Sequence, residues 1–411
     1  MPQKQLLIIG YVWPEPNSSA AGSRMMQLIS LFLSKGFKIT YASPAKTTDY
    51  TEDLTKLGVE IANIKANDSS VDQFLEALHP THVLFDRFMM EEQFGWRVAE
   101  VVPEAIRILD TEDLHFFRRA RQQAYKSKQS FKTNFLFTAE AKREIASIYR
   151  CDLSLIISQA ELNLLKTQFK IDKRLLLYLP FLVDYKRLKE RDLPLFQERQ
   201  DFISIGNFLH PPNYDQVLYL KEDIWPLIKA ELPEAKLHVY GAYTSQKVEQ
   251  LHQASEGFLI HGRAEHAINT VKHAKVLLAP LRFGAGLKGK FIDSMRAGTP
   301  AVTTTIGAEG LCGDLPWCGE IANEAKSFAE QAVKLYQNEK RWHKTQSNGF
   351  KLLEERFRLQ KFKPTVFKRL QKIEAELHQH RQNNFVGQML MHHSLQSTKY
   401  MSRWIELKSQ T

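Results

Sequence analysis

Residues 279–311 read APLRFGAGLKGKFIDSMRAGTPAVTTTIGAEGL, and this stretch decides how the C-terminal half of the chain folds. It follows the apolar run 276–279, which is typical of a buried strand. A glycine-rich loop (284–289) comes next, and a helical stretch (290–297) follows it. Gly298-Thr299-Pro300 ends that helix and begins another strand. The segment therefore predicts a strand–loop–helix–strand unit of a parallel α/β sheet.

The loop carries residue types that bind phosphate. Backbone N–H groups of a glycine-rich loop at a helix N-terminus point toward an anion. Lys288 and Lys290 add point charges inside the loop. Asp293, one helical turn further on, is placed to accept hydrogen bonds from ribose hydroxyls. On these residues alone, an ordinary strand–turn–helix connection with solvated lysines explains the pattern equally well.

The same alternation of strands and helices continues outward in both directions. The expected strands are residues 6–11, 37–42, 82–86, 106–110 and 153–158 in the first half, and 202–206, 236–241, 258–262, 275–279 and 301–304 in the second. Helical stretches fit between them, which indicates parallel sheets with crossover helices. Residues 185–200 are highly charged and contain no clear strand. We therefore expect a linker at 184–200 between two doubly wound α/β domains.

This division gives an N-terminal domain at 1–184 and a C-terminal domain at 200–350. Beyond residue 350 the chain is helical and basic, with an amphipathic helix expected at 355–380 and an extension at 381–411. The apolar stripe of the helix, at positions i, i+4, i+7 and i+11, consists of Val366, Leu370, Ile373 and Leu377. Such a stripe requires an apolar surface to cover it.

Composition excludes several classes of protein. The 411 residues contain no run of eighteen apolar residues, and the run 6–9 is too short for a signal peptide, so we expect a cytoplasmic protein. Three cysteines make no disulfide framework, and their spacing is not that of a zinc site. The net charge of +10 favours anionic partners. Because no signature of a nucleic-acid-binding module is present, we expect no nucleic acid among them.

The segment 279–311 resembles the donor-site signature of the retaining GT-B glycosyltransferases called family four. The matching residues are Gly284, Ala285, Gly286, Lys290, Asp293, Met295, Gly298 and Pro300, with 307–311 after them. The resemblance implies two Rossmann-like domains that face each other across a cleft, with helix 355–380 crossing back to the first domain. It implies transfer of a sugar, with retention, from a nucleoside-diphosphate sugar to a hydroxyl of a glycan, lipid-linked or protein acceptor. Surface glycan or polysaccharide synthesis is the expected setting.

The chain departs from the family pattern on the sugar side of the donor. Many members carry two glutamates separated by seven residues, and here the two positions hold Ala285 and Asp293. One carboxylate is therefore missing, and we expect the sugar contact to shift to Glu309. Gly286, in the same loop, is expected to contact the donor.

Three further segments resemble parts of the family's donor site. Gly206 and Asn207 end the strand that opens the C-terminal domain, and Asn207 stands near a position where members often have arginine. The two loop lysines are therefore expected to carry more of the phosphate charge. Arg263 lies at a strand tip expected near the nucleobase, although a surface arginine explains it equally well. Gly22, in the loop 14–24, is expected to bring a backbone N–H close to the phosphates.

The N-terminal half supplies the candidate catalytic residues. LDTEDLH at 109–115 follows a strand and resembles an Asp-x-x-Asp-Leu-His segment of related sequences. We expect Asp110 and His115 to act on the acceptor hydroxyl or to stabilise developing charge. A capping aspartate and a hydrogen-bonded histidine are the alternative. Asp86 and Glu92 are weaker candidates on the acceptor side.

The stretch 118–150 is rich in arginine and lysine and faces only two glutamates within itself, Glu140 and Glu144. Phenylalanines lie among the basic residues. Such a segment is able to rest on an anionic membrane, which predicts a peripheral contact at the inner face. A solvated basic face is the alternative.

Two other functions share this fold and stay open. A GT-B epimerase or hydrolase of nucleotide sugars needs carboxylates clustered at the sugar, and the alanine at 285 argues against that clustering. A non-catalytic relative would bind a nucleotide or a glycan. The donor loop holds no Asp-x-Asp pair, so we expect no metal ion and no cofactor besides the donor substrate.

Overall fold

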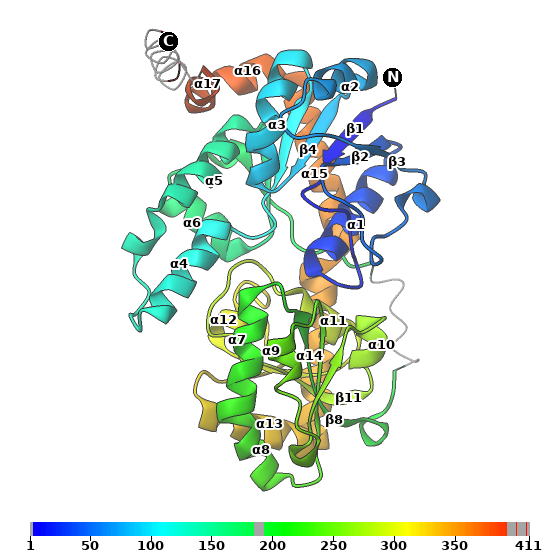
Figure 1. Ribbon diagram of the computed structural model, residues 1–411, viewed down its shortest axis with the longest axis vertical. Helices are drawn as coiled ribbons and strands as arrows, with labels where there is room; N and C mark the ends of the chain where they lie inside the picture. Colours follow the sequence, from blue (N-terminus) through cyan, green and yellow to red (C-terminus); the bar gives the residue numbers. More distant parts are fainter. Residues whose placement is uncertain (1–2, 185–192, 393–399, 401–407, 409–411) are drawn as a thin grey trace.

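The computed structural model describes residues 3–184, 193–392, 400 and 408. They form two α/β domains, one above the other along the longest axis of the molecule (Figure 1). Within these residues, no helix combines the length and the apolar character needed to cross a membrane. The predicted fold class, with two doubly wound domains, is confirmed.

The N-terminal domain is built on a seven-stranded parallel sheet in the order β3-β2-β1-β4-β5-β6-β7. Its strands are β1 (Gln5–Ile9), β2 (Lys38–Ser43), β3 (Glu60–Asn63), β4 (His82–Asp86), β5 (Ile106–Asp110), β6 (Leu153–Ile156) and β7 (Leu176–Tyr178). Its helices are α1 (Ala20–Leu33), α2 (Ser70–Leu78), α3 (Phe88–Val101), α4 (His115–Lys126), α5 (Ala139–Arg150) and α6 (Gln159–Thr167). The central strand β1 is apolar at every position from Leu6 to Ile9 because helices cover both faces of the sheet.

The C-terminal domain has a six-stranded parallel sheet in the order β10-β9-β8-β11-β12-β13. Its strands are β8 (Gln200–Asn207), β9 (Leu237–Ala242), β10 (Phe258–Gly262), β11 (Ala274–Ala279), β12 (Ala301–Thr303) and β13 (Gly319–Ile321). Its helices are α7 (Pro211–Tyr219), α8 (Trp225–Glu231), α9 (Gln246–Glu249), α10 (Ala267–Val271), α11 (Gly289–Arg296), α12 (Thr305–Ala308), α13 (Ala325–Gln337) and α14 (Glu339–Phe357). Chain order reverses between β8 and β11, and ligands bind at such switch points.

The chain passes between the domains twice, and the two passages lie side by side. Val183 N donates to Phe357 O at 2.7 Å, and Leu359 N donates to Val183 O at 2.9 Å. Residues 185–192 of the expected linker 184–200 lie outside the described residues. Helix α15 (Leu359–Ala375) then runs from the lower domain onto the upper one (Figure 1).

The expected crossing helix 355–380 is interrupted, because α15 ends at Ala375, but the whole predicted stripe, including Leu377 beyond that end, is buried in the core of the N-terminal domain. Val366 and Leu370 are each 1% exposed and belong to the same core as Leu28 and Phe32 of α1. Phe367 packs edge-on against Phe32, with ring centroids 5.6 Å apart. Two short helices follow, α16 (Leu377–Gln382) and α17 (Phe385–His392), and α17 packs on α5. The end of α16 and the whole of α17 lie in the expected extension 381–411.

Candidate active site

A cavity of about 690 Å³ lies between the two domains. The N-terminal domain contributes the loop between β1 and α1 together with the ends of β4 and β5. The C-terminal domain contributes the ends of β8 and β9, the turn after β10 and the loop between β11 and α11. The carboxyl ends of both parallel sheets thus face one space, where open α/β sheets bind their ligands.

The loop between β11 and α11 is pressed against the N-terminal domain, which explains its glycines. Gly286 has φ 62°, and a Cβ there would lie 2.6 Å from Asp113 Cβ. A Cβ on Gly289 would lie 2.6 Å from Ala20 Cβ of α1. A larger residue at either position would push the domains apart.

Lys288 at the end of this loop and Lys290 in the first turn of α11 line the cavity without forming an ion pair to any described residue. Lys290 Nζ donates to Asn213 Oδ1 and Gln216 Oε1, both at 2.9 Å, and both acceptors are neutral amides. Burial lowers the pKa of Lys290 to about 7 and that of Lys288 to about 8. Buried cations of this kind favour an anionic ligand, since an anion offsets their loss of hydration.

Asp293 of α11 lies on the same cavity wall, with 31% of its side chain exposed. Burial raises its pKa to about 6, and the nearest cation is Arg296, whose Nη1 lies 3.9 Å from Asp293 Oδ1. The carboxylate is therefore available to accept hydrogen bonds from a ligand.

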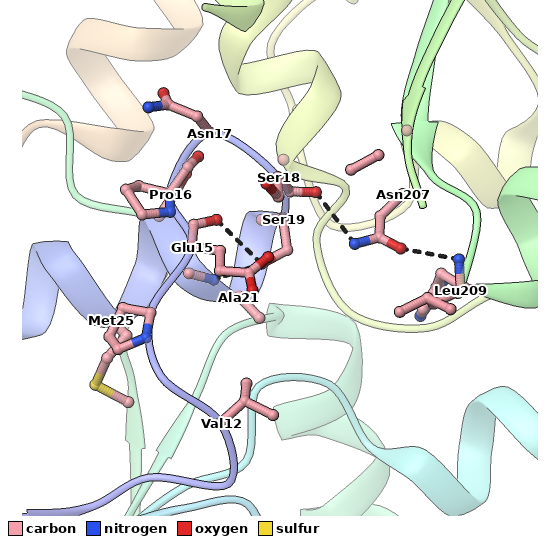
Figure 2. A pocket seen from close by; sticks show the side chains of 18 of the residues that line it. Val12, Glu15, Pro16, Asn17, Ser18, Ser19, Ala21, Met25, Asn207 and Leu209 are labelled. Atoms are coloured by element: carbon pink, nitrogen blue, oxygen red, sulfur yellow. Dashed lines mark hydrogen bonds between the residues drawn. The ribbon is translucent and has the colours of Figure 1, made fainter. Parts of the chain in front are cut away.

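The loop between β1 and α1 reaches across the cavity to the C-terminal domain. Asn207 Nδ2 donates to Ser18 O at 3.2 Å, a contact drawn in Figure 2. Arg263 Nε donates to Ser18 Oγ at 3.0 Å. Tyr243 Oη donates to Glu15 Oε1 at 2.8 Å. Asn207 and Arg263, both expected to contact the donor, thus line the cavity and also hold this loop over it.

Gly206 and Gly22 also lie on the cavity wall, although the reason for Gly22 differs from the expected one. Its N–H donates to Ser19 Oγ at 3.0 Å, within the cap of α1, and is not free for a phosphate. A Cβ at Gly22 would lie 2.4 Å from the backbone of Glu15. Tight packing of the loop is what requires the glycine.

Two expected donor contacts, Gly286 and Glu309, lie outside the cavity lining and instead join the domains. Gly286 N donates to Glu161 Oε1 at 2.8 Å, and Leu114 N donates to the same oxygen at 2.9 Å. Glu309 forms a two-pronged ion pair with Arg121 of α4. The sugar contact expected for Glu309 is corrected accordingly, since its carboxylate is already occupied.

The structure also moves the expected catalytic pair away from the cavity lining. Asp110 is fully buried and pairs with Arg24, whose Nη2 lies 2.7 Å from Asp110 Oδ1. His115 packs edge-on against Phe88, and burial lowers its pKa to about 3. Asp110 is thus held by Arg24 and does not cap a helix, while the His115 ring lies beside Phe88 with its Nε2 3.5 Å from Asp113 Oδ1. The acids of this segment that do line the cavity are Glu112 and Asp113.

Of the two weaker acceptor-side candidates, only Asp86 lines the cavity. Asp86 lies on the cavity wall at the end of β4. Glu92 does not line the cavity and pairs with Arg143 of α5, with Arg143 Nη2 2.6 Å from Glu92 Oε2. The sequence reasoning missed Arg87 and His210, which also line the cavity. In the sequence, Arg87 is marked only by its position directly after a strand, and His210 only by its position directly before a helix.

In the folded protein, nearby acidic side chains neutralise much of the positive charge of the stretch 118–150. Its arginines pair with acids, most of them outside the stretch, in the pairs Arg118–Asp113, Arg119–Glu140, Arg121–Glu309, Arg143–Glu92 and Arg150–Glu91. Glu144, expected to face this charge, instead accepts from His115 N and Phe116 N at the start of α4. Exposed lysines remain at 126, 128, 132 and 142.

Comparison with known proteins agrees with this geometry. Residues 199–338 match the family model described as glycosyl transferases group 1. A relative from Klebsiella pneumoniae, described as an uncharacterized 44.6 kDa protein in the cps region, is 25% identical over 171 residues. The matched part is 40% of this chain and 44% of that relative, less than half of each.

Solved structures match over most of the chain. Sucrose-phosphate synthase from Thermosynechococcus elongatus is 13% identical with a TM-score of 0.69, over 91% of this chain and 100% of that one. Staphylococcus aureus TarM, solved with UDP, is 10% identical with a TM-score of 0.68, over 90% and 100%. Anabaena HepE, solved with UDP-glucose, is 11% identical with a TM-score of 0.65, over 90% and 99%. The chain therefore has the same two-domain fold as these structures, the GT-B fold, and its residues 199–338 match the model of the group 1 glycosyl transferases.

Proposed function

We propose that this protein is a glycosyltransferase that moves a sugar from a nucleoside-diphosphate sugar to a hydroxyl of a glycan, lipid-linked or protein acceptor, with retention. The observation that carries the proposal is the pair Lys288 and Lys290, which line the interdomain cavity without an ion-pair partner among the described residues. A diphosphate leaving group needs such cations as the bond to the sugar breaks.

The cavity has room and suitable groups for a donor in one orientation. The diphosphate would lie on the two lysines and at the N-terminus of α11, which begins at Gly289. The ribose would lie at Asp293, one turn further along this helix. The base would lie near the ends of β9 and β10, beside Tyr243 and Arg263.

In the proposed reaction the bond from the anomeric carbon to the phosphate oxygen breaks, and a bond to the acceptor oxygen forms. The hydroxyl proton leaves with the nucleoside diphosphate, so atoms and charges balance. We propose that lysines, rather than a divalent metal ion, neutralise the leaving group. Surface glycan or polysaccharide synthesis is the proposed setting, because a relative is described by its place in a cps region.

We also propose a peripheral contact with an anionic membrane through residues 126–142. Four exposed lysines and Phe137, which is 64% exposed, support it. Co-sedimentation with phosphatidylglycerol vesicles should exceed that with phosphatidylcholine vesicles and should fall when Phe137 is changed to Ser. Equal sedimentation with both lipids would remove this contact from the proposal.

The central experiment screens UDP-, GDP- and ADP-sugars for thermal stabilisation of the protein, because a ligand that binds only the folded state raises its melting temperature. The stabilising donor is then incubated with glycan acceptors, and NMR follows transfer, hydrolysis and anomeric configuration. Transfer with retention, unaffected by EDTA, is the expected result. Hydrolysis or epimerisation without transfer would assign one of the alternative activities, and binding without turnover would indicate a non-catalytic relative.

A further inference from the structure

The ends of β4 and β5 form an unusual floor on the N-terminal side of the cavity. Asp86 and Asp110, the last residues of these strands, are partners in the parallel ladder. Each is followed within two residues by a charged residue with a positive φ, Arg87 with φ 73° and Glu112 with φ 60°. Such a backbone costs about 1–3 kcal/mol at each non-glycine residue and concentrates at functional sites. Asp86, Arg87 and Glu112 all line the cavity.

Two buried oxygens on this floor have no hydrogen-bond partner among the described residues, Asp86 Oδ1 and Glu112 Oε1. Asp86 is only 4% exposed, and its other oxygen accepts from Tyr11 N at 3.1 Å. Arg87 Nε lies 3.3 Å from Asp86 Oδ1, an ion pair without hydrogen-bond geometry. Buried acceptors are nearly always satisfied in folded proteins, so these two indicate hydroxyl donors on a ligand.

The charges on this floor balance one another, which restricts the ligand. The ionisable groups that face Glu112 are Arg24 from α1, Tyr41 from β2, Asp86 and Arg87 at the end of β4, and Asp110 from β5. Arg24 pairs with Asp110, and Arg87 pairs with Asp86. Burial raises the pKa of Glu112 to about 8, so the carboxyl carries its proton at neutral pH. A protonated carboxyl both donates and accepts a hydrogen bond, as a sugar hydroxyl does.

We propose that Asp86, Arg87 and Glu112 form a subsite for an uncharged sugar unit of the acceptor, whose hydroxyls they hydrogen-bond. The inference rests on the proposed function, because it places the acceptor opposite the two lysines that would hold the diphosphate. It excludes a carboxylate or phosphate on that unit, since the two arginines described beside Glu112 are each paired with an aspartate. Glu112 acts as a neutral donor and acceptor in this subsite and not as an ionised base.

The test measures binding of methyl glucoside, methyl galactoside and glucuronate by saturation-transfer NMR, with and without UDP. Loss of the Glu112 side chain should weaken binding of the neutral glycosides about tenfold, as expected for a lost buried hydrogen bond. Glu112→Gln keeps a donor and an acceptor and should bind within about threefold of the unchanged protein. Glu92→Gln is the matched control, because Glu92 does not line the cavity, and it should leave glycoside binding unchanged.

Both Glu112→Ala and Glu112→Gly are needed, because glycine tolerates the left-handed backbone and keeps the test valid if the alanine variant unfolds. Tighter binding of glucuronate than of the methyl glycosides would overturn the proposal, and so would equal loss in the glutamine and glycine variants. Absence of any glycoside signal would overturn it too. Nucleotide-sugar binding is recorded separately by thermal shift, so failure of the proposed function is distinguishable from failure of this subsite.

Discussion

Arg121 and Glu309 join the two domains through a two-pronged ion pair, with Nη1 to Oε2 and Nη2 to Oε1 both at 2.7 Å. Arg121 Nη1 also donates to Gly284 O at 2.9 Å, at the start of the glycine-rich loop. The loop that would hold the donor is therefore bonded to α4 of the opposite domain. The position of this loop is therefore tied to the position of α4.

A double-mutant cycle measures this coupling. We expect Arg121→Ala, Glu309→Gln and the double variant to show a coupling energy of about 1–3 kcal/mol in thermal unfolding, because the pair is charged, two-pronged and largely shielded from water. The exposed pair Arg174–Asp172 is the control, and its coupling should stay below about 1 kcal/mol. Equal coupling in both pairs would show that the interdomain contact is only a surface pair.

Donor binding should depend on pH through Lys290. Its pKa is lowered to about 7 in the free protein, and a bound diphosphate would raise it again, so binding takes up a proton. Affinity should be constant below pH 7 and fall as pH rises above it, by up to about tenfold between pH 7 and 8. Calorimetry with a nucleotide sugar, whose diphosphate does not titrate in this range, makes the measurement.

Lys290→Met should flatten that pH dependence as well as weaken binding. Lys275→Met is the control, because Lys275 lies over the ring of Phe196 and does not line the cavity. An unchanged pH slope in Lys290→Met would show that another group takes up the proton.

Glu161 should make stability depend on pH. Burial raises its folded-state pKa to about 8, above the usual 4.5, so the stabilisation is present at low pH and is lost as pH rises toward 8. Glu161→Gln keeps an oxygen for Leu114 N and Gly286 N, and its melting temperature should fall less between pH 5 and 8. Glu104→Gln, at an exposed position, should leave the slope unchanged. A steeper slope in Glu161→Gln would contradict this account.

Leu370 tests the crossing helix. It is 1% exposed in the core of the N-terminal domain, so Leu370→Ala should lower the free energy of unfolding by about 2–5 kcal/mol. The exposed Leu227 of α8 provides the control, and Leu227→Ala should change it by less than about 0.5 kcal/mol. Sugar transfer should also fall in Leu370→Ala, although this side chain does not line the cavity.

Asp293 tests the orientation of the donor. Asp293→Asn should weaken the binding of a ribonucleotide sugar several-fold, by about 1 kcal/mol or more. The reason is that an amide accepts hydrogen bonds less well than a carboxylate. An analogue without the 2′ and 3′ hydroxyls should bind the variant and the unchanged protein alike. If the substitution weakens the binding of both ligands equally, the carboxylate does not contact the ribose.

The local sequence pattern was sufficient for the central strands and for the edge strand β10, but it missed the three shortest edge strands. The central strands β1 and β4 are buried on both faces and therefore carry long apolar runs. The short edge strands β3, β7 and β13 were not predicted. Strand β13 has only three residues, Gly319–Ile321, and its conformation comes from pairing with β12 rather than from its own side chains.

The sequence by itself determined the two α/β domains, the glycine-rich loop and the placement of Lys288, Lys290 and Asp293 near its helix, because each depends on residues within about one strand–helix unit. Tertiary structure alone decided that Glu309 faces Arg121, 188 positions away in the chain, and that Glu161 holds Gly286, 125 positions away. The protonation of Glu112 was likewise decided by folding. Burial and charge pairing depend on which residues from distant parts of the chain come into contact. A local sequence pattern does not show those contacts.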